Sequence, residues 1–379
     1  MSAWPGKYAI GLTGNIATGK SVVRKMLEHL GAFGIDADAL AHRAMASTGP
    51  AFKPILQTFG NYILTPEGQI DRGRLGSIVF NDPRALQSLE DIVHPFVSQA
   101  IDLLAGRSKR RILVVEAIKL LEGGLAGKCD VIWVVDSPTE VQRARLIRKR
   151  NLSAEEALTR IQTQNPQADK LARAGTIINN ISAFEDTWEQ VQRAWVNLPA
   201  PKSPEQAEED STPDEAGVTV RRGLASDAAA IAEFINTVSN NDERRTREDV
   251  IVSFGQKAYF LASQEEELAA VIGWQVENLV TRADEFHTLE GVSPAALVIS
   301  LIHEVEHASA DLQSEAAFLF LEPILFEAAA ETLETMGYKA VEPDDIDITV
   351  WSEAMAESQP PDTTALFKKL REDRVLRPV

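Results

Sequence analysis

Cysteine is almost absent from this sequence, and long hydrophobic runs are missing. The lone Cys129 excludes an internal disulfide framework and is typical of a chain kept in a reducing compartment. No segment holds the roughly 18 unbroken apolar residues that a membrane span needs. The first residues also lack the apolar core behind a basic start that marks a signal peptide. We therefore expect a cytoplasmic protein that has no membrane partner.

Basic residues are scarce in the second half of the chain. Residues 1–196 hold 24 Lys and Arg against 20 Asp and Glu, whereas residues 197–379 hold 14 against 36. Such an acidic half repels phosphates, so we do not expect nucleic acid as a partner. At 379 residues the chain is also longer than one hydrophobic core usually supports. Length and charge together predict two domains with a boundary near residue 200.

Short apolar runs alternate with helical patterns in the first half. The alternation predicts a parallel sheet with helices on both faces, and in such sheets ligands bind at the carboxyl ends of the strands. Thr13, Asp38, Glu116 and Asp136 fall at or just past such ends. The predicted strands cover residues 7–13, 32–35, 111–115, 131–135 and 176–178, and the predicted helices cover 21–30, 39–45, 139–149 and 154–164.

The second half begins after a segment with almost nothing to bury. Residues 199–217 are rich in Pro, Glu, Asp and Ser, which predicts a solvated linker between domains 1–198 and 218–379. Beyond it we expect a second α/β domain and a C-terminal tail. Its predicted strands are 218–221, 258–262, 269–274, 279–281, 316–321 and 339–341, and its predicted helices are 228–236, 294–308 and 323–336.

A phosphate-binding motif follows the first predicted strand. Residues 14–21 match the pattern G-x-x-x-x-G-K-[ST], between a strand and a helix as the motif requires. The glycines let backbone N–H groups turn toward a phosphate at the helix N-terminus. Lys20 would reach the β- and γ-phosphates of ATP, and the Ser21 hydroxyl would bind Mg²⁺. The expected nucleotide-binding residues are Gly14, Asn15, Ile16, Ala17, Thr18, Gly19, Lys20 and Ser21.

The P-loop alone does not separate kinases from other nucleotide hydrolases. A GTPase would need a base-reading Asn-Lys-x-Asp, which this sequence lacks. An Asp pair soon after the first helix and an Arg-rich helix later favour a kinase of small molecules, because arginines in a lid can neutralise the transferring phosphoryl group.

Several further segments together identify a family. They are GLTGNIATGKS (11–21), IDADALAH (35–42), ILTPEGQIDRGRLGSIVFND (63–82), LEDIVHP (89–95), CDVIWVVDSP (129–138), QRARLIRKRN (142–151) and AGTIINN (174–180). With these segments, residues 7–195 resemble dephospho-CoA kinase. The resemblance implies a P-loop NTPase sheet with helical CoA-binding and lid regions. It also implies that the chain phosphorylates the ribose 3′-hydroxyl of dephospho-CoA with ATP and Mg²⁺, the last step of coenzyme A biosynthesis.

The resemblance also assigns roles to single residues. Asp38 matches the general base, although an Asp here could equally cap the helix expected at Ala39. Arg145 matches the catalytic arginine of the lid, with Arg148 and Arg150 as phosphate-facing companions and Arg143 left on the solvated face. Glu116 is a candidate to hold Mg²⁺ with Ser21, or else a surface acid. Asp36 and His94 are the candidate acceptor-binding residues, and His94 could instead be structural.

The second half resembles a GNAT acetyltransferase fold over residues 218–345. The opening VTVRRGLASDAAAI and the later LETMGYKA carry the likeness. The Gly-rich pyrophosphate-binding run that should precede the helix near Pro294 is replaced by Glu290–Ser293, so a degenerate or regulatory domain is expected, with a CoA-type ligand left possible. His303 and His307 fit H-E-x-x-H, but a short motif inside a helix more often marks an exposed polar face than a zinc site.

Two other functions stay open on sequence alone. One is another P-loop nucleoside or nucleotide kinase. The other is a protein that senses nucleotides or CoA without catalysis, against which the intact Lys20, Ser21 and Asp38 argue.

Overall fold

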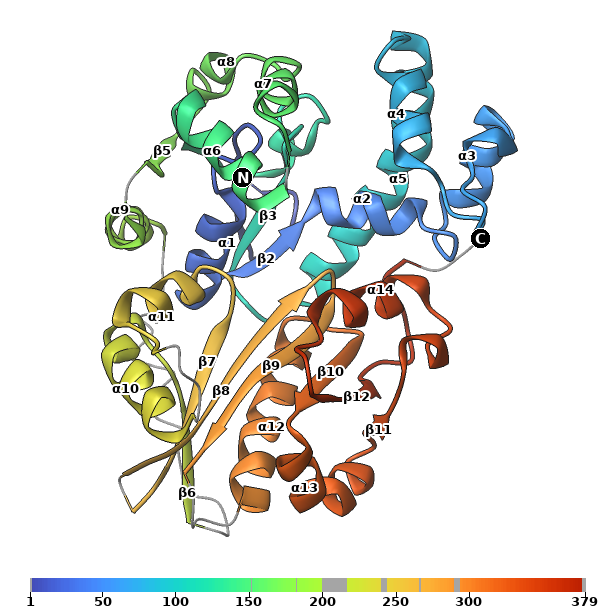
Figure 1. Cartoon of the computed structure of the whole chain (residues 1–379). Coiled ribbons are helices and arrows are strands. Elements are labelled where there is room, and N and C mark those ends of the chain that lie inside the picture. The colour runs from blue at the N-terminus through green and yellow to red at the C-terminus, as the bar shows by residue number, and fades with distance from the viewer. Residues whose placement is uncertain are drawn as a thin grey trace.

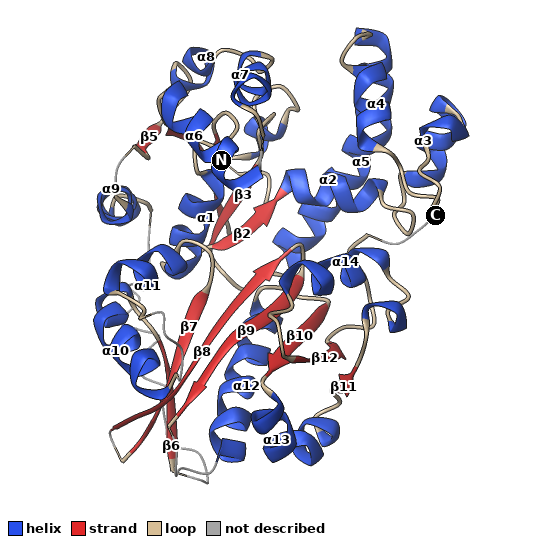
Figure 2. Ribbon diagram, viewed as in Figure 1, coloured by secondary structure: helices blue, strands red, loops and turns tan. Residues whose placement is uncertain are grey.

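Two sheets organise the protein. The computed structural model describes residues 2–150, 152–181, 183–199, 217–239, 244–265, 267–289 and 294–376. We refer to the part up to residue 199 as the first domain and to the part from residue 217 as the second domain. The expected linker at 199–217 lies almost wholly outside the described residues, and so does Glu290–Ser293. Figure 2 shows one sheet in each domain.

The first sheet is parallel, in the order β2-β3-β1-β4-β5. Its strands are β1 Tyr8–Thr13, β2 Phe33–Asp36, β3 Ile112–Glu116, β4 Val131–Asp136 and β5 Thr176–Asn179. The central strands β1 and β3 are almost fully buried, because both faces of the sheet are covered. Because all five strands run in one direction, their carboxyl ends lie at the same edge of the sheet. The P-loop follows β1 at this edge, and Asp36 and Glu116 are the last residues of β2 and β3.

Helices cover both faces of this sheet, which confirms the predicted architecture. One face packs on α2 Ala37–Met45 and α5 Pro83–Arg107, and the other packs on α1 Lys20–His29 and α9 Phe184–Val196. The helices α3 Phe52–Phe59 and α4 Arg72–Val79 extend the α5 side (Figure 1). The lid region comprises α6 Thr139–Arg150, α7 Ala154–Gln162 and α8 Gln167–Leu171.

The second sheet is mixed, in the order β11-β12-β10-β9-β8-β7-β6. Only the pair β9–β10 is parallel among the pairings of the described strands, and the others are antiparallel. The strands are β6 Val218–Arg222, β7 Ala258–Gln264, β8 Glu267–Glu277, β9 Val280–Thr288, β10 Ala316–Leu321, β11 Lys339–Ala340 and β12 Thr364–Lys369. The predicted second α/β domain is thus confirmed as a fold.

Helices also cover both faces of the second sheet. The helices α12 Pro294–Asp311 and α13 Pro323–Thr335 pack on one face, while α10 Ala228–Val238, α11 Arg247–Phe254 and α14 Thr349–Ser358 pack on the other. The predicted strand at 339–341 is confirmed as β11, but the prediction that it is the last strand is wrong. The last strand is β12, whose hydrogen bonds place it between β10 and β11.

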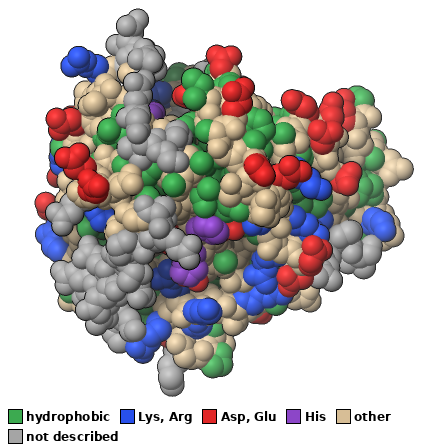
Figure 3. Space-filling model, turned by 90° about the horizontal axis from the view of Figure 1, so that it is seen from below, with side chains coloured by type: hydrophobic (Ala, Val, Ile, Leu, Met, Phe, Trp, Pro, Cys, Tyr) green, Lys and Arg blue, Asp and Glu red, His purple; other side chains and the backbone are tan. Residues whose placement is uncertain are grey.

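The second domain packs directly beneath the first (Figure 1). Leu279, Leu312 and Leu376 join the hydrophobic core around α2 and α5. A buried ion pair joins Arg43 of α2 to Glu315 at the start of β10. The face of the molecule seen from below carries acidic side chains spread among hydrophobic and basic ones (Figure 3). No helix among the described residues is long and apolar enough to cross a membrane.

Candidate active site

The P-loop is held open by glycines that tolerate no side chain. Gly14 has φ of 150° and Gly19 has φ of 95°. A Cβ on Gly14 would lie 2.4 Å from the Val135 carbonyl oxygen, and one on Gly19 would lie 1.9 Å from the Asn180 Nδ2. These contacts, rather than flexibility alone, explain why both positions need glycine.

Side chains from the lid region meet the start of the P-loop. The Gln167 Oε1 accepts a hydrogen bond from the Asn15 N–H at 3.0 Å, and the Gln164 Oε1 accepts one from the Ile16 N–H at 2.8 Å. Deeper in the loop, Lys20 is buried, and its Nζ donates to the Asn15 carbonyl at 3.2 Å. Hydrogen bonds at both the start and the end of the P-loop therefore hold its conformation.

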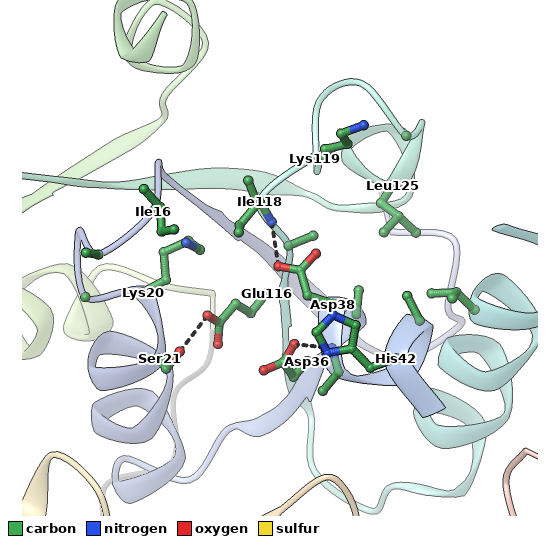
Figure 4. A pocket seen from close by; sticks show the side chains of 18 of the residues that line it. Ile16, Lys20, Ser21, Asp36, Asp38, His42, Glu116, Ile118, Lys119 and Leu125 are labelled. Carbon is green, nitrogen blue, oxygen red and sulfur yellow. Dashed lines mark hydrogen bonds between the residues drawn. The ribbon is translucent and has the colours of Figure 1, made fainter. Parts of the chain in front are cut away.

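The two acids of the pair Asp36 and Asp38 have different partners. The Asp36 carboxylate accepts a hydrogen bond from the Ala39 N–H at 2.9 Å and caps α2, which begins at Ala37. The alternative that Asp38 caps a helix starting at Ala39 is therefore wrong. Asp38 sits in the first turn, and its Oδ2 accepts a hydrogen bond from the Ile118 N–H at 3.0 Å. Figure 4 shows this bond, with Asp38 between Lys20 and His42.

Burial raises the pKa of Asp38 above its usual range. The hydrogen bond from the Ile118 N–H and the charge of Lys20 oppose this shift without cancelling it, and the carboxylate of Glu116 adds to it. Burial also raises the pKa of Asp36, against the opposing charge of Arg24. A carboxylate whose pKa is moved toward neutrality is a stronger proton acceptor than an ordinary one.

Ser21 and Glu116 meet at the floor of the site. The Ser21 Oγ donates to the Glu116 Oε1 at 2.9 Å (Figure 4). The Arg24 Nε donates to the Glu116 Oε2 at 2.7 Å. Glu116 is buried, so the alternative that it is a surface acid is wrong. A hydroxyl and a carboxylate are ligands that Mg²⁺ accepts, so these residues fit that ion.

The lid arginines differ in their surroundings. Arg145 donates from Nη1 to the carbonyl oxygens of Ala17 at 3.2 Å and Thr18 at 3.1 Å, and from Nη2 to the Asn180 carbonyl at 3.0 Å. Burial, and then the charge of Arg148, lower its pKa. Arg143 and Arg148 are exposed, and Arg148 lines the cavity. The side chain of Arg150 lies outside the described residues.

These residues share one cavity of about 1180 Å³. Its walls include Lys20, Asp38, His94, Glu116 and Arg145, which come from five different elements or the loops beside them. The structure thus brings together the P-loop, the acid pair and the candidate acceptor-binding histidine. His303 and His307 lie far from it in the chain, exposed on α12, which confirms the predicted exposed face. Among the described residues no cluster of three His, Cys, Asp or Glu could hold a metal.

The site matches a known family. The sequence model of the family described as dephospho-CoA kinase matches residues 8–186. A dephospho-CoA kinase of Moorella thermoacetica is 38% identical over 195 residues, which is 50% of this chain and 92% of that protein. The chain belongs to the dephospho-CoA kinase family. Another dephospho-CoA kinase, from Geobacter metallireducens, is 42% identical over 49% of this chain and 94% of its own length.

A second comparison concerns solved structures. An acetyltransferase of the GNAT family from Staphylococcus aureus is 14% identical and covers 41% of this chain and 99% of its own, with a TM-score of 0.32.

Membership of the dephospho-CoA kinase family makes the chain a phosphoryl transferase for which ATP is a substrate.

Sequence reasoning missed several side chains at this kinase site. Lys170 is buried beside Asp38 and donates from Nζ to the Ile118 carbonyl at 2.8 Å, and burial lowers its pKa. Asn180 joins β5 to the P-loop through the Thr18 carbonyl at 2.9 Å. Gln164 is only the last residue of the helix predicted over 154–164, and Gln167 lies outside every predicted element. The segment around Gln167 is polar in sequence, and only folding shows which of its side chains point inward.

Proposed function

We propose that this chain transfers the γ-phosphoryl group of ATP to the ribose 3′-hydroxyl of dephospho-CoA, giving CoA and ADP. The observation that carries the proposal is the place of Asp38, a half-buried carboxylate in the same cavity as the P-loop lysine. Phosphoryl transfer depends mainly on positioning and on stabilising charge, and this cavity supplies groups for both.

Asp38 is the proposed general base. The acceptor hydroxyl oxygen attacks the γ-phosphorus, the bond from that phosphorus to the β–γ bridging oxygen breaks, and the hydroxyl proton passes to the Asp38 carboxylate. The N–H of Ile118 fixes one carboxylate oxygen and leaves the other for the hydroxyl. The raised pKa supports this role, because the group then accepts the proton more readily.

The P-loop and lid carry the proposed electrostatic role. Lys20 would neutralise the β- and γ-phosphates, while P-loop N–H groups other than those that Gln164 and Gln167 already accept from would bind the phosphate oxygens. Ser21 and Glu116 would hold Mg²⁺, which lowers the cost of bringing phosphate charges together. Arg145 reaches the P-loop backbone, and Arg148, which follows it on α6, lines the same cavity, so both arginines would lie near the transferring group.

The proposed acceptor site lies on the side of Asp36 and His94. Both line the cavity together with apolar side chains from α4 and α5, among them Val79, Leu86 and Val93. A nucleotide that carries a long and partly apolar arm suits such a mixed wall. We further propose that the protein works in the cytoplasm, which suits the lone unpaired Cys129. A CoA-type ligand on the second domain remains a hypothesis.

An acceptor panel tests the proposal. Purified full-length protein is given ATP, Mg²⁺ and one acceptor at a time, from dephospho-CoA, nucleosides and nucleoside monophosphates, and ADP release is measured. We expect dephospho-CoA to be used with a kcat/KM far above that of every other acceptor. Efficient use of a nucleoside, with no turnover of dephospho-CoA, would contradict the proposal and favour another P-loop kinase activity.

A further inference from the structure

The walls of the kinase cavity do not all come from the kinase fold. Besides the P-loop and acid pair, the cavity is lined by residues of the second domain. Gln256 follows α11, and Glu277 and Asn278 form the end of the β8–β9 hairpin. In Figure 1 this hairpin runs upward from the second sheet to the junction of β2 and α2. The family match ends at residue 186, so this part of the wall lies outside what the chain shares with its family.

The tip of the hairpin is a tight turn that both domains hold in place. Glu277 pairs with Val280, and the two residues between them have left-handed backbones, with φ of 53° at Asn278 and 60° at Leu279. From the first domain, the Arg43 Nη1 donates to the Asn278 carbonyl at 2.6 Å and the Lys25 Nζ donates to the Val276 carbonyl at 2.9 Å. The turn is therefore fixed relative to the kinase site.

The side chain of Asn278 carries an unused acceptor. Its Oδ1 is buried and has no hydrogen-bond partner among the described residues. A buried amide oxygen without a donor is costly, so a rotation of this half-buried side chain that brings the oxygen to a donor in the cavity would be favourable. Asn278 also lines a smaller void of about 40 Å³ together with Asp36 and Ala39, which places it beside the first turn of α2. Asp38, the proposed base, belongs to that same turn.

We propose that Asn278 of the second domain binds the nucleoside part of the acceptor, with its Oδ1 accepting a hydrogen bond from an N–H or O–H of that nucleoside. This inference rests on the proposed function, because the acceptor's reacting hydroxyl must lie at Asp38 and its nucleoside must therefore lie near α2. The second domain then completes the acceptor site of the kinase. It acts as a wall of that site in addition to any function of its own.

Substitution of Asn278 in the full-length protein tests this inference. Asn278→Gly removes the amide and suits the positive φ, whereas Asn278→Asp keeps an acceptor oxygen and tolerates the same backbone. The matched control is Asp362→Gly, an exposed position with φ of 59° in the turn before β12. For each variant KM is measured for dephospho-CoA and for ATP, together with kcat and the melting temperature.

The expected result is selective for the acceptor. Asn278→Gly should raise KM for dephospho-CoA about three- to tenfold, the effect of one lost hydrogen bond. KM for ATP and the melting temperature should match those of Asp362→Gly, and Asn278→Asp should recover most of the acceptor affinity. An unchanged KM for dephospho-CoA would overturn the inference. Equal changes in both KM values together with a lower melting temperature would also overturn it, by showing a structural role. Absence of dephospho-CoA turnover in the wild-type protein would instead contradict the proposed function.

Discussion

The two domains use buried polar side chains in different ways. In the first domain Lys20, Asp38 and Glu116 converge on a cavity, and burial leaves the pKa of Asp38 raised. In the second domain several buried polar groups form hydrogen bonds with one another. Thr281 bonds Ser309 at 2.7 Å and Ser314 at 2.9 Å, and Tyr259 donates to Glu285 at 3.0 Å. The comparison teaches that burial of polar groups indicates chemistry only where they face a space that a ligand can fill.

The largest expected effect is at the P-loop lysine. Lys20→Ala should lower kcat by about 10²- to 10³-fold, because a preorganised charge at the transferring phosphoryl group is lost. Steady-state kinetics with saturating dephospho-CoA would measure this effect. Lys339→Ala is the control, since this exposed lysine lies on β11 at the outer edge of the second sheet and touches neither the P-loop nor the cavity lining. A Lys20→Ala enzyme that keeps most of its turnover would remove Lys20 from the mechanism.

The next largest effect is on stability at the domain interface. Arg43→Ala removes the hydrogen-bonded guanidinium of the fully buried Glu315 and leaves it only the more distant Arg374 at 4.0 Å, so it should destabilise the protein by about 3 to 5 kcal/mol. Arg110→Ala breaks a second interdomain pair, with Asp311 at 3.1 Å, but that pair is partly exposed and should cost less than about 1 kcal/mol. Denaturant unfolding would compare the two. Equal losses of unfolding free energy in the two variants would show that burial does not determine how much each ion pair stabilises the protein.

A smaller and pH-dependent effect belongs to Glu285. Burial alone would raise the pKa of this carboxyl, but the His287 ring, whose Nε2 lies 3.8 Å from Oε1, and the charges of Lys257 and Arg245 outweigh it and hold the pKa at about 2. A depressed pKa stabilises the fold fully above the ordinary value near 4.5, and this stability is lost as the pH falls from there toward 2.

Glu285→Gln should therefore destabilise the protein near neutral pH by on the order of 2 to 3 kcal/mol, and by much less at pH 2 to 3. Unfolding measured across pH 2 to 7 checks this, with Glu331→Gln on the exposed side of α13 as the control. A loss that stays constant over the whole range would exclude the charge of Glu285 as its cause.

The smallest expected effect is at the histidines of α12. His303→Ala and His307→Ala should each change the free energy of unfolding by less than about 0.5 kcal/mol, because both side chains are exposed. Metal analysis of the purified protein accompanies these variants. One zinc ion per chain, lost in both variants, would contradict the interpretation of this motif as an exposed helix face.

Much of the first domain could be predicted from local sequence. The P-loop is a contiguous motif, and strands such as Val131–Asp136 are continuous apolar runs. The β12 strand was missed because its short sequence TALFKK gains its hydrogen-bond partners only from β10 and β11. The helix α14 was missed together with it, since its few buried side chains pack on Phe318 and Phe320 of the distant β10.

Sequence patterns predicted which residues make up the candidate site better than they predicted the contacts of those residues. Asp36 and Asp38 are two residues apart, and sequence could not tell which one caps α2, because this depends on the Ile118 N–H reaching Asp38 from after β3. No sequence pattern around Asn278 indicated that this residue lies at the kinase cavity. It reaches the cavity through domain packing between residues roughly 240 positions apart, and local patterns do not describe such packing.

The most direct test of the account is the pH dependence of phosphorylation by wild-type protein and by Asp38→Asn. The base must be ionised, so the wild-type rate should fall as the pH drops through the raised pKa of Asp38, above the ordinary range for aspartate. Conversion of dephospho-CoA to CoA should be about 10²- to 10⁴-fold slower in Asp38→Asn, and this acid limb should vanish. Near-normal conversion by Asp38→Asn, with the acid limb intact, would contradict the account.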